Sequence, residues 1–338
     1  MISTQNRWAE PSASSVTEGA PVLPLGALRS AARGLEGVAV QTPLLPVPAL
    51  TDRLGVPVLV KCEHLQPVGA FKIRGAYTAV SRIPFEQRTR GVITYSSGNH
   101  GQAVALAARL LGTSAVVVMP ERAPAIKVAG VTRQGAEVVF AGSSSADRYQ
   151  RARALAEERG LAMVPPYENL DVIAGQGTCG LEILDVLPDV ETILVPVGGG
   201  GLIAGIAAAV AAVKPSVRVI GVEAAGAPKL ARALEVGRPV TLELAKSLAD
   251  GLLPLSIGSL PFAIMSGVVR EAVQVSEDEI VSAVRFLYAE LQLTAEPSGA
   301  VTTAALLTGR VRPTGPTVAV VSGGNVDPEV FQRLVTLR

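Results

Sequence analysis

The sequence predicts an α/β protein with two doubly wound open-sheet lobes. Short runs rich in Val and Ile alternate along the chain with helical stretches rich in Ala, Leu and Glu. The runs show little alternation of apolar and polar residues, which is typical of parallel strands covered on both faces. A length of 338 residues exceeds one ordinary hydrophobic core and favours two lobes. In open α/β sheets ligands bind at the carboxyl ends of the strands, so functional residues are expected there.

The order of the elements predicts how the chain is divided. Strands are expected at 57–61, 91–95, 114–120, 136–141, 192–197, 217–223 and 317–323. Helices are expected at 102–111, 147–159, 202–213 and 277–291. Residues 1–20 are polar and are interpreted as a loose N-terminal tail, and residues 91–165 as a small inserted domain. Residues 21–90 and 166–338 would form the large domain.

Composition and charge narrow the class of protein. Hydrophobic residues make up 49% of the chain and the formal net charge is +1, which argues against nucleic-acid or membrane partners. No apolar run reaches membrane-spanning length without a glycine cluster, a proline or a charge. Cys62 and Cys179 lie far apart in apolar segments and suit buried thiols better than a disulfide. We therefore expect a well-packed cytoplasmic protein that binds small molecules.

The segment QPVGAFKIRGAY, residues 66–77, contains a candidate nucleophile, Lys72. Apolar residues recur at helical spacing from Ile73 until Pro84, which places Lys72 at the start of a short amphipathic helix. Apolar surroundings lower the pKa of a lysine and free its amine for imine formation. The alternative is a lysine that packs its stem on Phe71 and keeps its ammonium group in water.

A second candidate site, the motif SSGNHGQA, follows the strand expected at 91–95. Gly98 and Gly101 allow the backbone to approach a ligand closely, and the first amides of the next helix are unsatisfied donors. These amides could bind a carboxylate together with the polar side chains of Ser96, Ser97, Asn99 and His100. The alternative is an ordinary capped turn, because Ser and Asn are common N-cap residues.

A run of glycines follows the strand expected at 192–197 and comprises Gly198, Gly199, Gly200 and Gly201. Such a run is unfavourable for folding unless the backbone must wrap closely around a ligand, and the following helix N-terminus favours phosphate. Gly199, Gly201 and Ala204 also satisfy the dinucleotide motif G-x-G-x-x-A, with Glu223 about twenty residues further on. Read alone, this unit favours an NAD-dependent dehydrogenase.

Two further motifs lie near the C-terminus. Glu296 opens EPSGAVTTAALL, which reads equally well as a helix start with an acidic first turn. Ser322 follows the strand in TVAVVSGGN, where its hydroxyl could contact a heteroatom of a ligand. The alternative is a tight turn that uses Gly and Asn for positive φ.

The ordered set FKIRGA, SSGNHGQA, VIAGQGT, PVGGGG, EPSGA and SGGNVD resembles the fold-type II, tryptophan-synthase-β-like pyridoxal-phosphate enzymes. The resemblance is to their serine/threonine dehydratase and serine racemase branch, and it covers nearly the whole chain after the tail. It implies a homodimer whose large domain binds pyridoxal 5'-phosphate in a site between the two lobes. It also implies β-elimination of water from a β-hydroxy amino acid such as L-threonine or L-serine, giving a 2-oxo acid and ammonia.

Several other functions stay open. The same resemblance permits a serine or other amino-acid racemase, in which Ser97 would act as a base on the face opposite Lys72. The glycine run leaves an NAD-dependent dehydrogenase as an alternative, and a non-catalytic amino-acid-binding relative is a further one. In the lyase and the racemase alike, Lys72 would form the Schiff base with the cofactor and move the α-proton of the substrate.

The resemblance also implies the binding residues. Phe71 would lie beneath the cofactor ring, Asn99 would bind the ring hydroxyl, and Ser322 would face the pyridine nitrogen with Glu296 close by. The cofactor phosphate would be bound by Gly198, Gly199, Gly200, Gly201 and Leu202. The substrate carboxylate would be bound by Ser96, Ser97, Asn99, His100 and Gly101.

The chain departs from this pattern at the divalent-cation site of the family, which uses an acidic residue, a carbonyl and a second acidic residue. Glu223 and Ala227 match the first two, but Lys229 stands where the second acidic residue would be. A lysine ammonium could take the place of the cation by pairing with Glu223 or Asp250, so no metal is expected. Arg148 aligns loosely with a substrate-side arginine of racemases, but it is interpreted as part of a solvated helix face.

Overall fold

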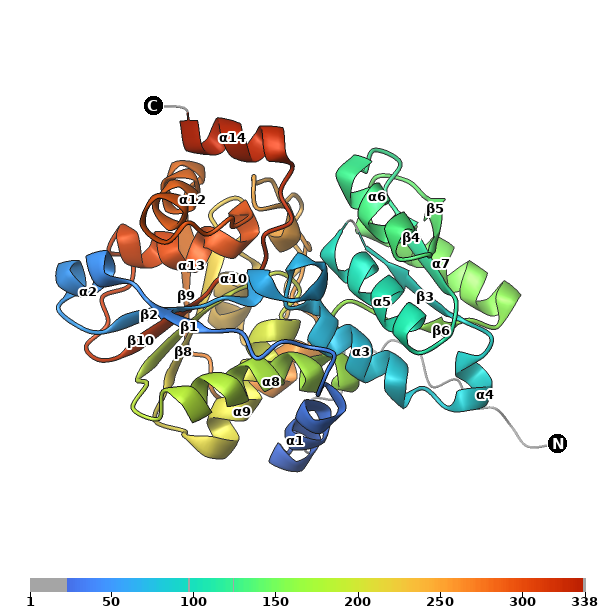
Figure 1. Cartoon of the computed structure of the whole chain (residues 1–338), viewed down its shortest axis with the longest axis horizontal. Coiled ribbons are helices and arrows are strands. Elements are labelled where there is room, and N and C mark those ends of the chain that lie inside the picture. Colours follow the sequence, from blue (N-terminus) through green and yellow to red (C-terminus); the bar gives the residue numbers. More distant parts are fainter. Residues whose placement is uncertain (1–22, 97, 124, 337–338) are drawn as a thin grey trace.

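The computed structural model describes residues 23–96, 98–123 and 125–336, and it confirms the predicted α/β class (Figure 1). The predicted tail, residues 1–20, and the candidate Ser97 lie outside the described residues. One sheet has six strands in the order β1-β2-β10-β7-β8-β9, and the other has four in the order β5-β4-β3-β6. Two separate sheets, each with helices around it, provide the two lobes that the strand pattern predicted.

The larger sheet is mostly parallel. Its strands are β1 (Leu44–Pro46), β2 (Val58–Lys61), β7 (Thr192–Pro196), β8 (Arg218–Ala224), β9 (Glu271–Val275) and β10 (Thr317–Val320). Only the pairing of β1 with β2 is antiparallel. Neither β1 nor β9 was expected from the sequence, because β1 has three residues including a proline and β9 is half exposed at the edge. The last strand, β10, lies in the middle of the sheet, between β2 and β7.

The smaller sheet is entirely parallel. It is formed by β3 (Val92–Tyr95), β4 (Ala115–Met119), β5 (Glu137–Phe140) and β6 (Ala162–Met163), and it is covered by α5 (Asn99–Leu110), α6 (Ala125–Arg133) and α7 (Ser145–Arg159). All of these residues lie within 91–165, although the exact domain boundaries stay a prediction. Helix α3 (Lys72–Arg82) packs against both α5 and α8, so it lies between the two sheets (Figure 1).

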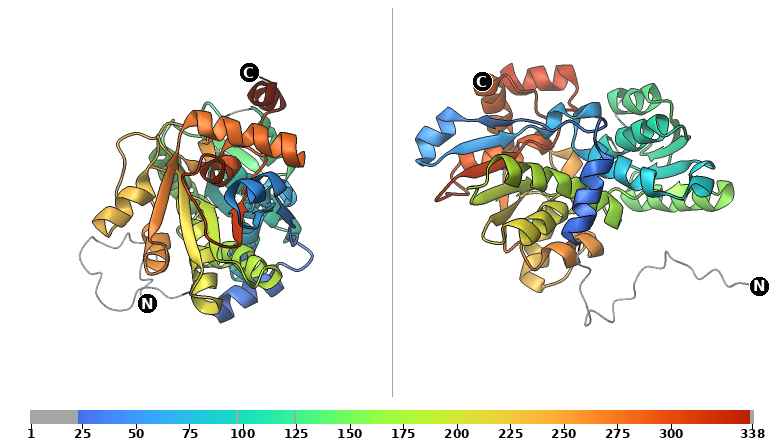
Figure 2. Two further views of the ribbon diagram at one scale, coloured as in Figure 1. Left: turned by 90° about the vertical axis from the view of Figure 1, so that its left-hand side faces the viewer. Right: turned by 60° about the horizontal axis from the view of Figure 1, so that its bottom comes forward.

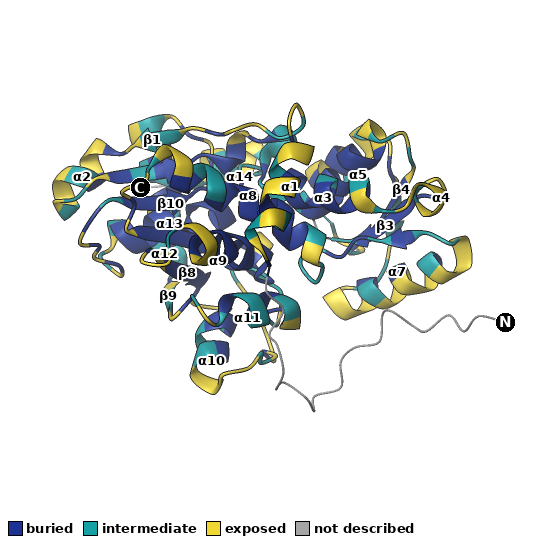
Figure 3. Cartoon of the chain, turned by 90° about the horizontal axis from the view of Figure 1, so that it is seen from below, coloured by how far each residue is buried: buried dark blue, intermediate teal, exposed yellow. Residues whose placement is uncertain are grey.

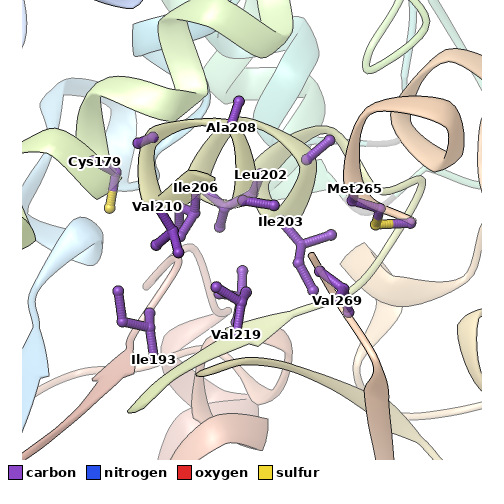
Figure 4. Close-up of a cluster of buried hydrophobic side chains, with 14 of the residues drawn as sticks. Cys179, Ile193, Leu202, Ile203, Ile206, Ala208, Val210, Val219, Met265 and Val269 are labelled. Carbon is purple, nitrogen blue, oxygen red and sulfur yellow. The ribbon is translucent and has the colours of Figure 1, made fainter. Parts of the chain in front are cut away.

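Helices cover both faces of the larger sheet, as the two views in Figure 2 show. The remaining helices are α1 (Leu25–Gly34), α2 (Pro48–Leu54), α4 (Phe85–Arg88), α8 (Leu170–Val186), α9 (Gly201–Val213), α10 (Lys229–Val236), α11 (Ser259–Met265), α12 (Glu277–Leu291), α13 (Pro297–Leu307) and α14 (Pro328–Thr336). Strand residues alternate between faces: Ile193 packs in the cluster with α8 and α9, whereas Leu194 packs in the cluster with α12 and α13. In Figure 4, Ile206 and Val210 of α9 point toward Ile193 and Val219.

Glycines let α8 and α9 approach each other closely. A Cβ atom built on Gly205 would lie 2.5 Å from the backbone nitrogen of Gly177, so neither position has room for a side chain. Gly175 contacts α3 in the same way, at Arg74. The central helices and strands are buried and the outer faces of α2, α7 and α10 are exposed (Figure 3). Helix α8 therefore connects α3, which begins with Lys72, to α9, the helix that follows the glycine run.

A buried ion cluster also fixes α3. The guanidinium group of Arg74, two residues after Lys72, is 2.7 Å from the Glu63 carboxylate and 2.6 Å from that of Glu182. Arg74 and Glu63 are almost fully buried, and each charge has a partner of opposite sign. Among the described residues, no helix is both long and apolar enough to cross a membrane.

Candidate active site

Lys72 is the first residue of α3, at the position that the apolar periodicity predicted. Its Nζ donates a hydrogen bond to the Pro166 carbonyl at 3.1 Å and lies 5.0 Å from the centroid of the Phe71 ring. None of the ion pairs among the described residues includes Lys72. Desolvation by burial lowers the pKa of Lys72 to about 8. More of this amine is therefore unprotonated near neutral pH than in an ordinary lysine, as a nucleophile requires.

The segment before Lys72 runs antiparallel to the segment after β10. The amide of Phe71 donates to the Ser322 carbonyl at 3.1 Å, Ala70 bridges to Gly323, and Gly324 donates to the Gly69 carbonyl at 2.9 Å. These bonds place Ser322 next to Phe71, as expected for two groups that contact one ligand. Ser322 is 4% exposed, and its hydroxyl has no hydrogen-bond partner among the described residues. That hydroxyl remains available to a heteroatom of a ligand.

The glycine run forms a tight loop between β7 and α9. A Cβ atom on Gly199 would lie 2.1 Å from Cδ1 of Tyr167, and one on Gly198 would lie 2.8 Å from the Gly251 carbonyl oxygen. Gly200 has a φ of +97°, which side chains rarely adopt. Within α9, the Ala204 amide donates to the Gly200 carbonyl, so the amides before it have no acceptor inside the helix. The loop thus offers backbone donors suited to a phosphate.

Asn99 and Glu296 meet across the two lobes. Asn99 is the first residue of α5, and its Nδ2 donates to Glu296 Oε1 at 2.7 Å. Glu296 is 3% exposed, and burial, with the nearby charge of Asp250, raises its pKa to about 7. In the same loop, the Ser96 hydroxyl accepts a hydrogen bond from the Gly98 amide at 3.1 Å.

His100 and Gly101 are buried inside the small lobe. His100 Nε2 lies 3.1 Å from the Val164 carbonyl, and because a carbonyl only accepts, this nitrogen carries the proton. Burial and the positive charge of Lys72 lower the pKa of His100 to about 3, so the ring is neutral. A Cβ atom on Gly101 would lie 2.7 Å from Val117 Cγ1, so this glycine allows α5 to pack on the sheet.

Three residues near the site had no role in the sequence-based prediction. Pro166 and Tyr167 belong to the crossover from β6 to α8, and they contact Lys72 and Gly199 respectively. Lys127 of α6 forms an ion pair with Asp250 of the large lobe and packs against Gly98. Neither the sequence around Pro166 and Tyr167 nor the sequence around Lys127 in α6 carries a local pattern that predicts these contacts.

Lys229 confirms one predicted pairing and excludes the other. Its buried Nζ lies 3.3 Å from Glu223 Oε1 and donates to the carbonyl oxygens of Val197, Ala227 and Leu252 at 3.0–3.1 Å. The prediction of a pairing with Asp250 is wrong, because Asp250 pairs with Lys127. The described residues contain no group of three or more His, Cys, Asp or Glu side chains able to hold a metal ion.

The structure also bears on the predictions made for Glu223 and Arg148. Glu223 also accepts hydrogen bonds from the amides of Leu230 and Ala231 at 2.8 and 3.0 Å, so its carboxylate is not free to bind a ribose as the dehydrogenase alternative requires. The interpretation of Arg148 as a solvated residue is wrong, because its side chain is 8% exposed and donates to Ser143 and Ser145.

Comparisons with known proteins agree with this geometry. The family model "Pyridoxal-phosphate dependent enzyme" matches residues 35–323. An L-threonine ammonia-lyase of Geobacter sulfurreducens is 46% identical over 87% of this chain and 74% of its own length. An L-threo-3-hydroxyaspartate ammonia-lyase of Saccharomyces cerevisiae is 40% identical over 88% of this chain and 91% of its own. The solved structure of maize serine racemase superposes with a TM-score of 0.89 at 35% identity, covering 92% of this chain and 96% of that one.

Proposed function

We propose that this chain, which belongs to the family of pyridoxal-phosphate dependent enzymes, is an ammonia-lyase that acts on a β-hydroxy amino acid such as L-threonine or L-serine. The products would be a 2-oxo acid and ammonia. The observation that carries the proposal is the half-buried amine of Lys72, with a pKa of about 8 and no ion-pair partner among the described residues. The ammonia-lyase activities named for relatives at 46% and 40% identity support the same reaction class.

The residues of the site fit the cofactor of the family. Pyridoxal phosphate, when bound, supplies an electron sink that stabilises negative charge at the α-carbon of the substrate. Lys72 would hold its aldehyde, and the amides after Gly200 would hold its phosphate. The Ser322 hydroxyl would meet the ring nitrogen, and Asn99 would meet the ring oxygen. The close contact of Gly199 with Tyr167 supports this arrangement, because a side chain there would distort the phosphate loop.

The side chains of this chain would direct the reaction toward loss of the β-hydroxyl. The Lys72 amine, being partly unprotonated near neutral pH, can accept the α-proton of the substrate. A serine hydroxyl is far too weak an acid to protonate the ring nitrogen, so Ser322 would leave the ring a weaker electron sink than a carboxylate would. This property of Ser322 would favour rapid departure of the β-hydroxyl over transamination. His100, which is neutral, adds no competing charge beside the amine.

Amino-acid racemisation is a second candidate function, favoured by the superposition on maize serine racemase. Inversion needs a second base on the face opposite Lys72, and Ser97, which lies outside the described residues, would be that base. We also propose that the protein is a cytoplasmic homodimer. The two free, buried cysteines, Cys62 and Cys179, support a reducing compartment, and sedimentation would measure the subunit number.

The test is a substrate panel with the cofactor-loaded protein. L-threonine, L-serine and L-threo-3-hydroxyaspartate are assayed separately for ammonia, for 2-oxo acid and for the opposite enantiomer of the substrate. L-alanine, which has no β-hydroxyl to lose, is the control. We expect 2-oxo acid from at least one of the three hydroxy amino acids and none from alanine. Inversion without elimination would assign the racemase instead, and absence of both would refute the proposal.

A further inference from the structure

Asn325 connects three segments of the site. It follows β10, and its Nδ2 donates to the Val68 carbonyl at 2.6 Å and to Asn99 Oδ1 at 3.0 Å. Val68 lies four residues before Lys72, and Asn99 begins α5 in the small lobe. A single amide group therefore touches both the segment that carries the lysine and the residue that faces Glu296.

These contacts define the orientation of two amide groups. A backbone carbonyl can only accept a hydrogen bond, so Asn325 must turn its NH₂ group toward Val68. The second hydrogen of that NH₂ group then points at Asn99, which must present its oxygen. The NH₂ group of Asn99 is consequently directed away from Asn325 and toward Glu296. Because the Val68 carbonyl can only accept, one orientation of the Asn325 amide and one of the Asn99 amide satisfy all three hydrogen bonds.

We propose that Asn325 is a positioning residue, which holds the Asn99 amide so that its NH₂ group donates to Glu296 and to the ring oxygen of the cofactor. An amide NH₂ group has two hydrogens, and Glu296 accepts one of them. The other has no acceptor among the described residues and would meet the ring oxygen. This inference rests on the proposed function, because it concerns the same cofactor site. A flipped Asn99 would present an oxygen to an anionic ring oxygen and repel it.

A purely structural role for Asn325 is the rival explanation. Val68 has a φ of 60° and is followed by Gly69 with a φ of 69°, so the turn before Lys72 is strained at a β-branched residue. Asn325 holds this turn through the Val68 carbonyl. An experiment must therefore separate stabilisation of the turn from orientation of Asn99.

A double-mutant cycle makes this separation. Asn325→Ala, Asn99→Ala and the double variant are prepared without cofactor and titrated with pyridoxal phosphate. The dissociation constant and the pH midpoint of the visible cofactor band are measured for each. We expect Asn325→Ala to weaken cofactor binding about tenfold or more and to shift the pH midpoint. Because Asn325 would act through Asn99, the double variant should match Asn99→Ala. Additive effects, or a change of less than about twofold in Asn325→Ala, would overturn the proposal.

Two more variants complete the design. In Asn325→Asp the carboxylate has no hydrogen to donate, so Asn99 would turn its NH₂ group toward it, and the loss of affinity should exceed that of Asn325→Ala. This nearly isosteric variant also serves if the alanine variant fails to fold. Val68→Gly relieves the strain of the turn. If Val68→Gly restores cofactor affinity to Asn325→Ala, Asn325 only holds the turn and the proposal is wrong.

Measurements on the parent protein distinguish a failure of the proposed function from a failure of the role proposed for Asn325. Absence of a cofactor band in the parent would refute the proposed function itself. A normal band in the parent together with an unchanged pH midpoint in the Asn325 variants would refute only the role of Asn325.

Discussion

Two lysines near the glycine loop have contrasting surroundings. Burial lowers the pKa of both Lys72 and Lys229. Lys229 is fully enclosed by one carboxylate and three carbonyl oxygens. Lys72 has one hydrogen bond, to the Pro166 carbonyl, and no ion pair among the described residues. The number of oxygen partners, rather than the pKa shift, distinguishes an amine that can react from one that supports the structure.

The two lysines also contact residues next to the same loop. Lys229 binds the carbonyl of Val197, the residue before the glycine run, while Lys72 binds the carbonyl next to Tyr167, which covers Gly199. Substitution of either lysine should therefore alter cofactor binding, but only substitution of Lys72 should abolish the reaction.

The largest effect is expected from Lys72→Ala. Turnover should fall by at least about a thousandfold, because the variant lacks both the amine that binds the cofactor and the base. Reduction with borohydride should no longer fix the cofactor to the protein, as mass spectrometry would show, while circular dichroism stays unchanged. Lys246→Ala, at an exposed lysine, is the control. Near-parent turnover of Lys72→Ala would contradict the assignment of the nucleophile.

Lys229→Met should act mainly on stability. Removing the ammonium leaves the buried Glu223 carboxylate without its cation, which should lower the free energy of unfolding by about 3–5 kcal/mol. Chemical denaturation measures this loss, with Lys246→Met as the control. At saturating cofactor the variant should still bind it covalently. If Lys229→Met folds but never binds the cofactor, the assignment of a purely structural role to Lys229 is wrong.

Gly199→Ala tests the glycine loop itself. The added Cβ would overlap the Tyr167 ring, so the loop or the ring must shift. Overpacking of this kind destabilises a structure by about 1–3 kcal/mol. Cofactor binding should therefore weaken up to about a hundredfold. Titration of the visible cofactor band measures the change. Gly267→Ala, which has no atom within 4 Å of the new Cβ, is the control. Combining Gly199→Ala with Tyr167→Ala should recover part of the affinity, and no recovery would argue against the overlap.

The effect of pH on covalent binding of the cofactor should be smaller than the effects of these substitutions, and it should depend on Lys72. Below pH 8 its amine is mostly protonated and cannot attack an aldehyde, whereas above its pKa of about 8 it is free. The rate of covalent capture by the cofactor-free protein should therefore rise with pH and level off above about pH 8. Stopped-flow absorbance gives this profile. A rate that keeps rising toward the ordinary lysine pKa of 10.5 would show that burial does not activate the amine.

Divalent cations should have no effect at saturating cofactor, because the Lys229 ammonium fills the oxygen cluster at Glu223. Turnover and melting temperature are compared with added Mg²⁺, with added Ca²⁺ and after treatment with a chelator. An increase in either quantity on adding a cation would mean that Lys229 does not replace one.

Local patterns predicted most of the fold and much of the site. Strands buried on both faces, such as AVVVM in β4, are recognisable because they form continuous apolar runs. The two-residue β6 and the proline-containing β1 lack that signal. Lys72 and the glycine run were found because each stands within a short motif whose residues act together, and the family model and relatives bear out the cofactor that this motif order implied.

Contacts between distant residues could not be predicted in the same way. Lys127 and Asp250 are separated by 123 positions, and Asn99 and Asn325 by 226. The burial of Arg148 likewise depends on how α7 packs on the small sheet, because its own segment is polar. The sequence indicated a tight turn at Gly323, Gly324 and Asn325 only as an alternative, and only the folded chain shows that the Asn325 amide reaches Asn99.

The central position of β10 affects how the protein is made. Until β10 has been synthesised, β2 and β7 have no strand between them, because β10 follows both of them in the chain. The pairing of Phe71 with Ser322 is also missing until that point, so Lys72 then lacks part of its surroundings. The surroundings of Lys72 are therefore complete only when segments from distant parts of the chain have paired, because Ala70 bridges to Gly323 and β10 pairs with both β2 and β7.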